Sequence, residues 1–310
     1  MPALLPRAPA PQPTARRWPV GRLLAWAALG LMLAITLVPL LVMLGTALEN
    51  PLGLMHRAAP AAGGIWPQDP TLINFRRVLG GLTPEQGLAL GGSGAEINFL
   101  RSLGLSLVFT TVVVVMQTSS CAMAAYAFAR LSFVGKRVLF GLFVGSMMLP
   151  GVVLFIPNFI LVRDLGWLNS LAGMVAPFAL MSGFSVFFLR QFFLALPRDL
   201  EEAARLDGAS PWRVFWRIAV PLNLGPLATI AMLTGIGAWN EFFWPFIVSS
   251  GENMQVLPVA LQSFKAQSPQ GQVDWTGLMA ASSIALLPTL VLLVLAGRKV
   301  VDSVQFSGGK

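Results

Sequence analysis

Long apolar runs separated by polar segments dominate the chain, and their lengths predict membrane-spanning helices. A lipid-crossing α-helix needs about 20 mainly apolar residues. Stretches of that length cover residues 23–48, 99–130, 138–162, 170–196, 222–248 and 276–296. Prolines interrupt several of them, which is tolerated where neighbouring helices or a cavity satisfy the freed carbonyls. The pattern predicts an all-α, polytopic bundle of six transmembrane helices.

The polar segments divide this bundle into parts. We expect a disordered basic tail before the first helix and a second tail after the last one. A long segment rich in Gly and Pro follows the first helix, and it is too long for a tight connection. The expected parts are a tail at 1–22, a first transmembrane helix at 23–48, a long external loop at 49–98, a core at 99–300 and a tail at 301–310.

The basic residues predict the orientation of the bundle. Six spans place both termini on one side of the membrane, and most of the 21 Lys and Arg residues lie in the segments on that side. An excess of Lys and Arg marks the cytoplasmic side. We therefore expect a multi-pass membrane protein with both termini in the cytoplasm.

Composition excludes several classes of protein. Hydrophobic residues make up 55% of the chain, charged residues make up 11%, and mean hydropathy is +0.72. The net charge is +8, and the basic residues cluster beside the apolar spans. They therefore indicate membrane topology, and we expect no nucleic-acid partner. The single cysteine, Cys121, and the single histidine, His56, exclude a disulfide framework and a Cys/His metal site. No phosphate-binding G-x-x-x-x-G-K-[ST] sequence occurs, so we expect no catalytic residues and no bound cofactor.

One densely charged segment, residues 197–221, predicts two short helices joined by a turn. Asp199 is placed to cap the first helix, with Glu202 completing a capping box. Gly208 suits the left-handed conformation that ends a helix, and Ser210 suits the cap of the second helix. An ordinary amphipathic loop and a DNA-binding helix-turn-helix both have this arrangement of two short helices joined by a turn. Apolar spans at both ends hold the segment at a membrane, which argues against DNA.

Fixed residues at fixed spacing give the segment a resemblance to a known family. Glu202-Ala203-Ala204, then Gly208, then Ile218-Ala219-Val220-Pro221 resemble the EAA loop of binding-protein-dependent ABC importer permeases, with Val220 where Leu is usual. The resemblance implies that this loop couples the permease to ATPase subunits. The implied coupling residues are Glu201, Glu202, Ala203, Ala204, Asp207, Gly208, Ala209, Ile218 and Pro221.

Further stretches resemble the carbohydrate-importer branch with its maltose-type, six-span subunit. They begin at Asp69, Ala125, Met147, Phe188, Trp239 and Asp274. The resemblance implies the type I importer fold and a location in the bacterial inner membrane. It further implies a second related permease, two cytoplasmic ABC ATPases that bind ATP and Mg²⁺, and an external solute-binding protein. It also implies that a sugar, or a related polyol or glycerol-phosphate-like solute, is the cargo.

Polar groups inside the spans are candidates for the transport pathway, because such groups often mark pathways. The candidates are Asn158, Ser182, Ser185, Asn240 and Glu241. Each of them serves equally well as a group that hydrogen-bonds within or between helices. Three alternative functions stay open: an ABC importer for a non-sugar solute, a secondary transporter driven by an ion gradient, and a membrane scaffold without transport.

Overall fold

The computed structural model describes residues 19–52, 66–67, 69–92, 98–251, 254–262, 264 and 273–305. Residues 1–18 and 306–310 of the two expected tails, and parts of the long loop at 49–98 and of the segment at 249–275, lie outside these residues. Within them every regular element is a helix, as the apolar pattern predicts. Three helices are long and apolar enough to cross a membrane, or five spans if each of two bent pairs counts as one.

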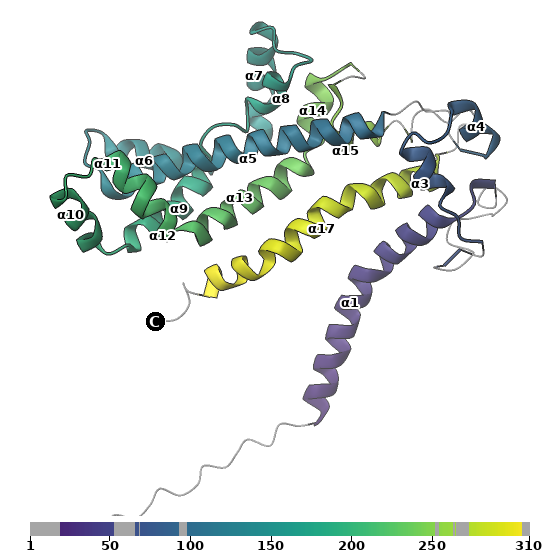
Figure 1. Cartoon of the computed structure of the whole chain (residues 1–310), viewed down its shortest axis with the longest axis horizontal. Coiled ribbons are helices and arrows are strands. Elements are labelled where there is room, and N and C mark those ends of the chain that lie inside the picture. Colours follow the sequence, from purple (N-terminus) through teal and green to yellow (C-terminus); the bar gives the residue numbers. More distant parts are fainter. Residues whose placement is uncertain are drawn as a thin grey trace, which may run out of the picture.

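Three helices are much longer than the rest. They are α1 (Pro19–Leu48), α5 (Phe99–Arg130) and α17 (Trp275–Gln305). α5 and α17 run along the molecule, whereas α1 slants steeply away from them (Figure 1). α5 matches its expected span. α1 begins at Pro19, so residues 19–22 of the expected disordered tail are helical, and α17 continues to Gln305, so residues 301–305 of the second expected tail are helical too. α5 packs against the shorter helices α9 (Gly183–Ala195) and α13 (Leu224–Trp239), which makes α5 the central element.

The third, fourth and fifth expected spans are broken, and the breaks in the third and fourth lie at prolines. The third span consists of α6 (Lys136–Ser146) and α7 (Gly151–Asp164), which meet at 103°. Pro150 cannot donate a backbone N–H and disfavours a helical residue before it, so α6 ends ahead of it. The fourth span is split into α8 (Leu171–Val175) and α9 at Pro177.

Shorter helices cover the end of the molecule opposite the charged segment (Figure 1). The stretch beginning at Asp69 forms the short helix α3 (Ile73–Val78). The loop also holds α4 (Pro84–Ala89), and α15 (Leu257–Ala260) lies beside α5. The fifth expected span is also broken, because α13 ends at Trp239 and a separate helix, α14 (Phe243–Val248), follows it.

Small and aromatic side chains form the core between these helices. Ala122 and Ala125 of α5 are buried and permit close approach of α9, whose Leu189 and Phe193 are also fully buried. Tyr126 and Phe193 stack edge to face with ring centroids 5.7 Å apart. The same cluster includes Phe215 and Ala219, so the charged segment is packed into this core.

Candidate functional site

The charged segment, residues 197–221, folds as predicted into two helical pieces joined by a turn. The first piece is α10 (Arg198–Leu206). The second comprises α11 (Pro211–Val214), the π-helix η1 (Phe215–Ala219) and α12 (Val220–Leu222). Together with α6 they form one end of the molecule (Figure 1). We call this segment the coupling segment, after the role that its resemblance to the EAA loop implies.

The start of α10 differs from the prediction. Its N-cap is Pro197, which makes no side-chain hydrogen bond, so the predicted capping box of Asp199 and Glu202 is wrong. Because the φ angle of Pro197 suits the residue before a helix, α10 begins two residues earlier than the acidic pattern indicated. Asp199 and Glu201 instead lie in the first turn, where a negative charge stabilises the helix dipole.

The turn between the two pieces matches the prediction. Gly208 has φ +79°, in the left-handed region. Its N–H donates to the Arg205 carbonyl at 3.0 Å, and the Ala209 N–H donates to the Ala204 carbonyl at 2.9 Å, which is the Schellman pattern. Ser210 then caps α11 by accepting a hydrogen bond from the Arg213 N–H at 3.3 Å. Local hydrogen bonds therefore fix the angle between the pieces.

The implied coupling residues divide between two faces of α10. Glu201 is 5% exposed and Ala204 packs against the core. Glu202 and Ala203 are exposed, and Leu206 is 89% exposed. Asp207 and Gly208 continue the exposed face, while Ala209 is half-buried. One face thus anchors the helix, and the other presents an acidic residue, a small residue and a leucine.

A buried ion pair holds the anchoring face. The Glu201 carboxylate Oε1 lies 3.2 Å from Nε of Arg130, the last residue of α5. The Nε–H does not point at this oxygen, so the contact is an ion pair without an aligned hydrogen bond. Arg130 also donates to the carbonyl of Leu196, just before α10. A single guanidinium therefore ties both the entry and the body of α10 to α5.

The apolar side chains of the second piece divide between the core and the surface. Phe215 and Ala219 are buried in the core, whereas Trp212 and Trp216 are 60% and 44% exposed. Ile218 is half-buried and packs against the same core, and Pro221 is exposed. After α12 the chain turns by 80° into α13.

The candidate pathway residues lie in three places and form no hydrogen bonds with one another. Ser182 is the N-cap of α9, and its N–H donates to Cys121 Sγ at 3.3 Å. Ser185 is buried one turn further on. Asn158 is half-buried in α7. Among the residues that the structure describes, no group of three or more His, Cys, Asp and Glu could hold a metal ion.

Asn240 and Glu241 make local contacts at the break between α13 and α14. The Asn240 side-chain amide donates to the Ile236 carbonyl at 2.8 Å. The Glu241 Oε1 accepts from the Trp244 N–H at 3.1 Å and so caps α14. Both contacts fit the alternative reading of these residues as groups that satisfy the backbone within a span.

Among the polar contacts between elements that were not predicted are three that join distant parts of the chain. Thr234 donates to Gln117 Oε1 at 2.9 Å, between α13 and α5. A glutamine in a Val-rich span was the signal for this contact, since such a side chain needs a partner in an apolar environment. Arg77 pairs with Asp274 at 2.9 Å, which ties α3 to the start of α17. The third is the Arg130–Glu201 pair.

Comparison of the sequence with known proteins identifies a family and several relatives. The sequence model of the family described as "Binding-protein-dependent transport system inner membrane component" matches residues 118–303. The arabinooligosaccharides transport system permease protein AraQ of Bacillus subtilis is 34% identical over 71% of this chain and 75% of that protein. The trehalose transport system permease protein SugB of Mycobacterium tuberculosis is 32% identical over 77% of this chain and 82% of that protein.

A solved structure shares the fold. One chain of a bacterial ABC transporter involved in the import of the acidic polysaccharide alginate superposes with a TM-score of 0.76 and 22% sequence identity, over 94% of this chain and 99% of that chain. The family match extends from the centre of α5 through the coupling segment into α17. The chain therefore belongs to the family of inner-membrane components of binding-protein-dependent transport systems, the multi-pass permease subunits of ABC importers.

Proposed function

We propose that this chain and a second related permease together form the import pathway for a sugar. Both termini face the cytoplasm, two ATPase subunits dock on the coupling segment, and an external binding protein delivers the cargo. The observation that carries this proposal is the division of α10 into a buried, ion-paired face and an exposed face. A helix that is rigidly attached on one side and free on the other suits the transmission of force from a partner.

The exposed apolar surface supports a partner within the membrane. Met148 and Val152, on either side of the α6–α7 bend, are 85% and 75% exposed. Large apolar side chains also remain exposed along most of α1, including Trp26 at 73%. Contiguous surfaces of this kind indicate lipid or another membrane protein. We assign part of this surface to the second permease.

The substrate class rests on the relatives. The names of the two relatives given above mention arabinooligosaccharides and trehalose, which are both carbohydrates. A non-sugar solute is the alternative cargo. A secondary transporter driven by an ion gradient is disfavoured because such proteins rely on charged relays inside the membrane, and Glu241 instead caps a helix.

The test of the proposal is charge reversal on the exposed face of α10. Glu202→Lys is expected to leave membrane insertion and pairing with the second permease intact, and to abolish uptake and substrate-stimulated ATP hydrolysis. Asp199→Lys is the matched control, because it reverses an exposed charge on the same helix outside the EAA sequence. The measurement is co-purification of the ATPases and their activity with and without loaded binding protein. Full stimulation in Glu202→Lys would show that α10 is not the coupling element.

A further inference from the structure

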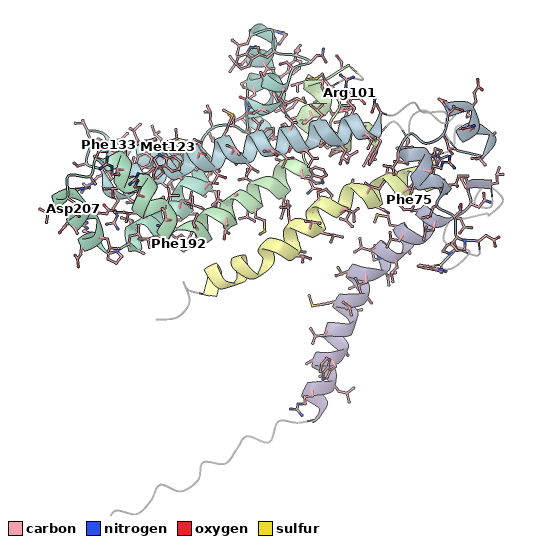
Figure 2. The ribbon with its side chains drawn as sticks, viewed as in Figure 1. Phe75, Arg101, Met123, Phe133, Phe192 and Asp207 are labelled. Atoms are coloured by element: carbon pink, nitrogen blue, oxygen red, sulfur yellow. The ribbon has the colours of Figure 1, made fainter. Side chains whose placement is uncertain are left out.

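A cavity of about 500 Å³ opens between the end of α5, the start of α6 and the start of α10. Its lining carries four cationic side chains, from Arg130, Lys136, Arg137 and Arg198. We call it the basic pocket. Figure 2 shows Phe133, which also lines it, at the same end of the molecule as Asp207 of the coupling segment. None of the described residues that line the pocket is acidic.

Two of the four cations are already engaged. Arg130 pairs with Glu201, and Lys136 Nζ donates to the Leu131 carbonyl at 2.7 Å. Arg137 and Arg198 are exposed and have no acidic partner among the residues that the structure describes. The positive-inside rule accounts for basic residues at this end of a span. It does not account for the convergence of Arg137 and Arg198, neither of which pairs with an acidic residue that the structure describes, on one cavity.

The start of α6 adds to the positive potential. Lys136 and Arg137 occupy its first turn, where a helix favours acidic residues because of its dipole. The N-cap is Gly135, which has no side chain to accept from the first-turn amides. Two cations at the positive end of an uncapped helix repel one another and the dipole. A bound anion would relieve both effects.

The apolar part of the lining indicates which anion. Leu131, Phe133 and Val138 complete the pocket beside the cations. Val138 and Leu142, one turn apart on α6, are 67% and 64% exposed and lead away from the pocket along the helix. Adjacent Val134 is 99% exposed. A free phosphate would use only the cations, whereas a phospholipid would place its headgroup among them and an acyl chain along α6.

We propose that the basic pocket binds the headgroup phosphate of an anionic phospholipid, so that a lipid lies between α6 and α10. Clustered Lys and Arg residues at the membrane surface attract anionic lipids. This proposal rests on the proposed function only for the leaflet that supplies the lipid, the cytoplasmic one. Lipid binding is measured in detergent without transport, so its failure is separate from a failure of the coupling proposal.

The test uses the intact transport complex and native mass spectrometry. Purified complex is titrated with phosphatidylglycerol, with zwitterionic phosphatidylcholine, and with inorganic phosphate as a competitor. We expect retained phosphatidylglycerol, weaker binding of phosphatidylcholine and little competition by phosphate. Arg137→Gln with Arg198→Gln is expected to weaken phosphatidylglycerol binding on the order of tenfold, and the corresponding double Lys variant to retain it. Arg213→Gln with Arg217→Gln removes two exposed charges from the neighbouring helical piece and is the control.

Several outcomes would overturn the proposal. They are equal binding of both lipids, full displacement by inorganic phosphate, or the same loss in the control variant as in the Gln variant. Loss of the ATPase subunits with unchanged lipid binding would assign the pocket to a protein partner instead. If the double Gln variant does not assemble, the single variants Arg137→Gln and Arg198→Gln provide the same comparison, since both side chains are exposed.

Discussion

Arg130 Nε and Glu201 Oε1 lie 3.2 Å apart, and both side chains are 6% exposed. This pair joins the end of the central helix α5 to the anchoring face of α10. Of the two adjacent glutamates, the residue before the EAA sequence is buried, and the first residue of the sequence itself, Glu202, is exposed. Glu201 therefore attaches α10 to α5, whereas Glu202 lies on the surface that is open to a partner.

Removing one charge of this pair should destabilise the protein more than removing its neighbour. Glu201→Gln leaves the Arg130 charge buried without its partner, which costs about 3 kcal/mol in folding free energy. Glu202→Gln alters an exposed side chain and is expected to change stability by less than about 0.5 kcal/mol. The measurement is thermal unfolding of the purified complex, followed by tryptophan fluorescence. Arg130→Met combined with Glu201→Met should recover most of the loss, because no unpaired charge remains. Equal midpoints for the two Gln variants would contradict this assignment.

Gly208 tests whether the turn angle matters for coupling. A Cβ at this position meets no atom within 4 Å, so only the backbone angle of +79° limits substitution. Gly208→Asn is expected to retain most uptake, because Asn tolerates the left-handed region, whereas Gly208→Val should lose it through strain of about 1–2 kcal/mol. Uptake and ATPase co-purification are measured for both. Equal activity of the two variants would show that the left-handed turn is dispensable.

The sequence located the turn well because its requirements are local. Gly208 and Ser210 each act through hydrogen bonds that span a few residues. The cap at Asp199 failed for an equally local reason, since Pro197 starts the helix first. The Arg130–Glu201 pair could not be predicted, because nothing in either stretch indicates which distant residue its charge will meet.

Hydropathy located the spans but not their breaks. Hydropathy reports whether a segment is apolar. Because α6 and α7 are both apolar, hydropathy gives no sign of the bend between them. The 103° angle between them depends on how the chain packs on either side of Pro150. The sequence also placed Asn240 and Glu241 in one continuous helix, whereas the structure gives them backbone-satisfying roles at its end.

The Arg77–Asp274 pair is expected to stabilise the opposite end of the molecule. Arg77 Nη2 lies 2.9 Å from Asp274 Oδ1, with side-chain exposures of 10% and 3%. Arg77→Gln should therefore lower the free energy of unfolding by about 3 kcal/mol. Arg76→Gln removes the same charge from the neighbouring, exposed position and should be nearly neutral. Thermal unfolding of the two variants side by side measures the difference. A neutral Arg77→Gln would mean that this pair contributes nothing to the attachment of α3 to α17.

Substitutions of Glu241 can distinguish a structural role of this residue from a role in the transport pathway. Its carboxylate Oε1 accepts from the Trp244 N–H at 3.1 Å. Glu241→Gln keeps a side-chain oxygen that accepts the same bond, whereas Glu241→Ala removes the acceptor and costs about 1 kcal/mol, typical of a lost helix cap.

If the carboxylate acts as a cap, the Gln variant should retain uptake and stability, and the Ala variant should lose part of both. If its charge serves the pathway, the two variants should lose uptake to the same extent while Glu241→Gln stays as stable as the wild type. Uptake rates and thermal midpoints of both variants distinguish these outcomes. We expect the first, because the carboxylate already has a backbone partner in the same break that it caps.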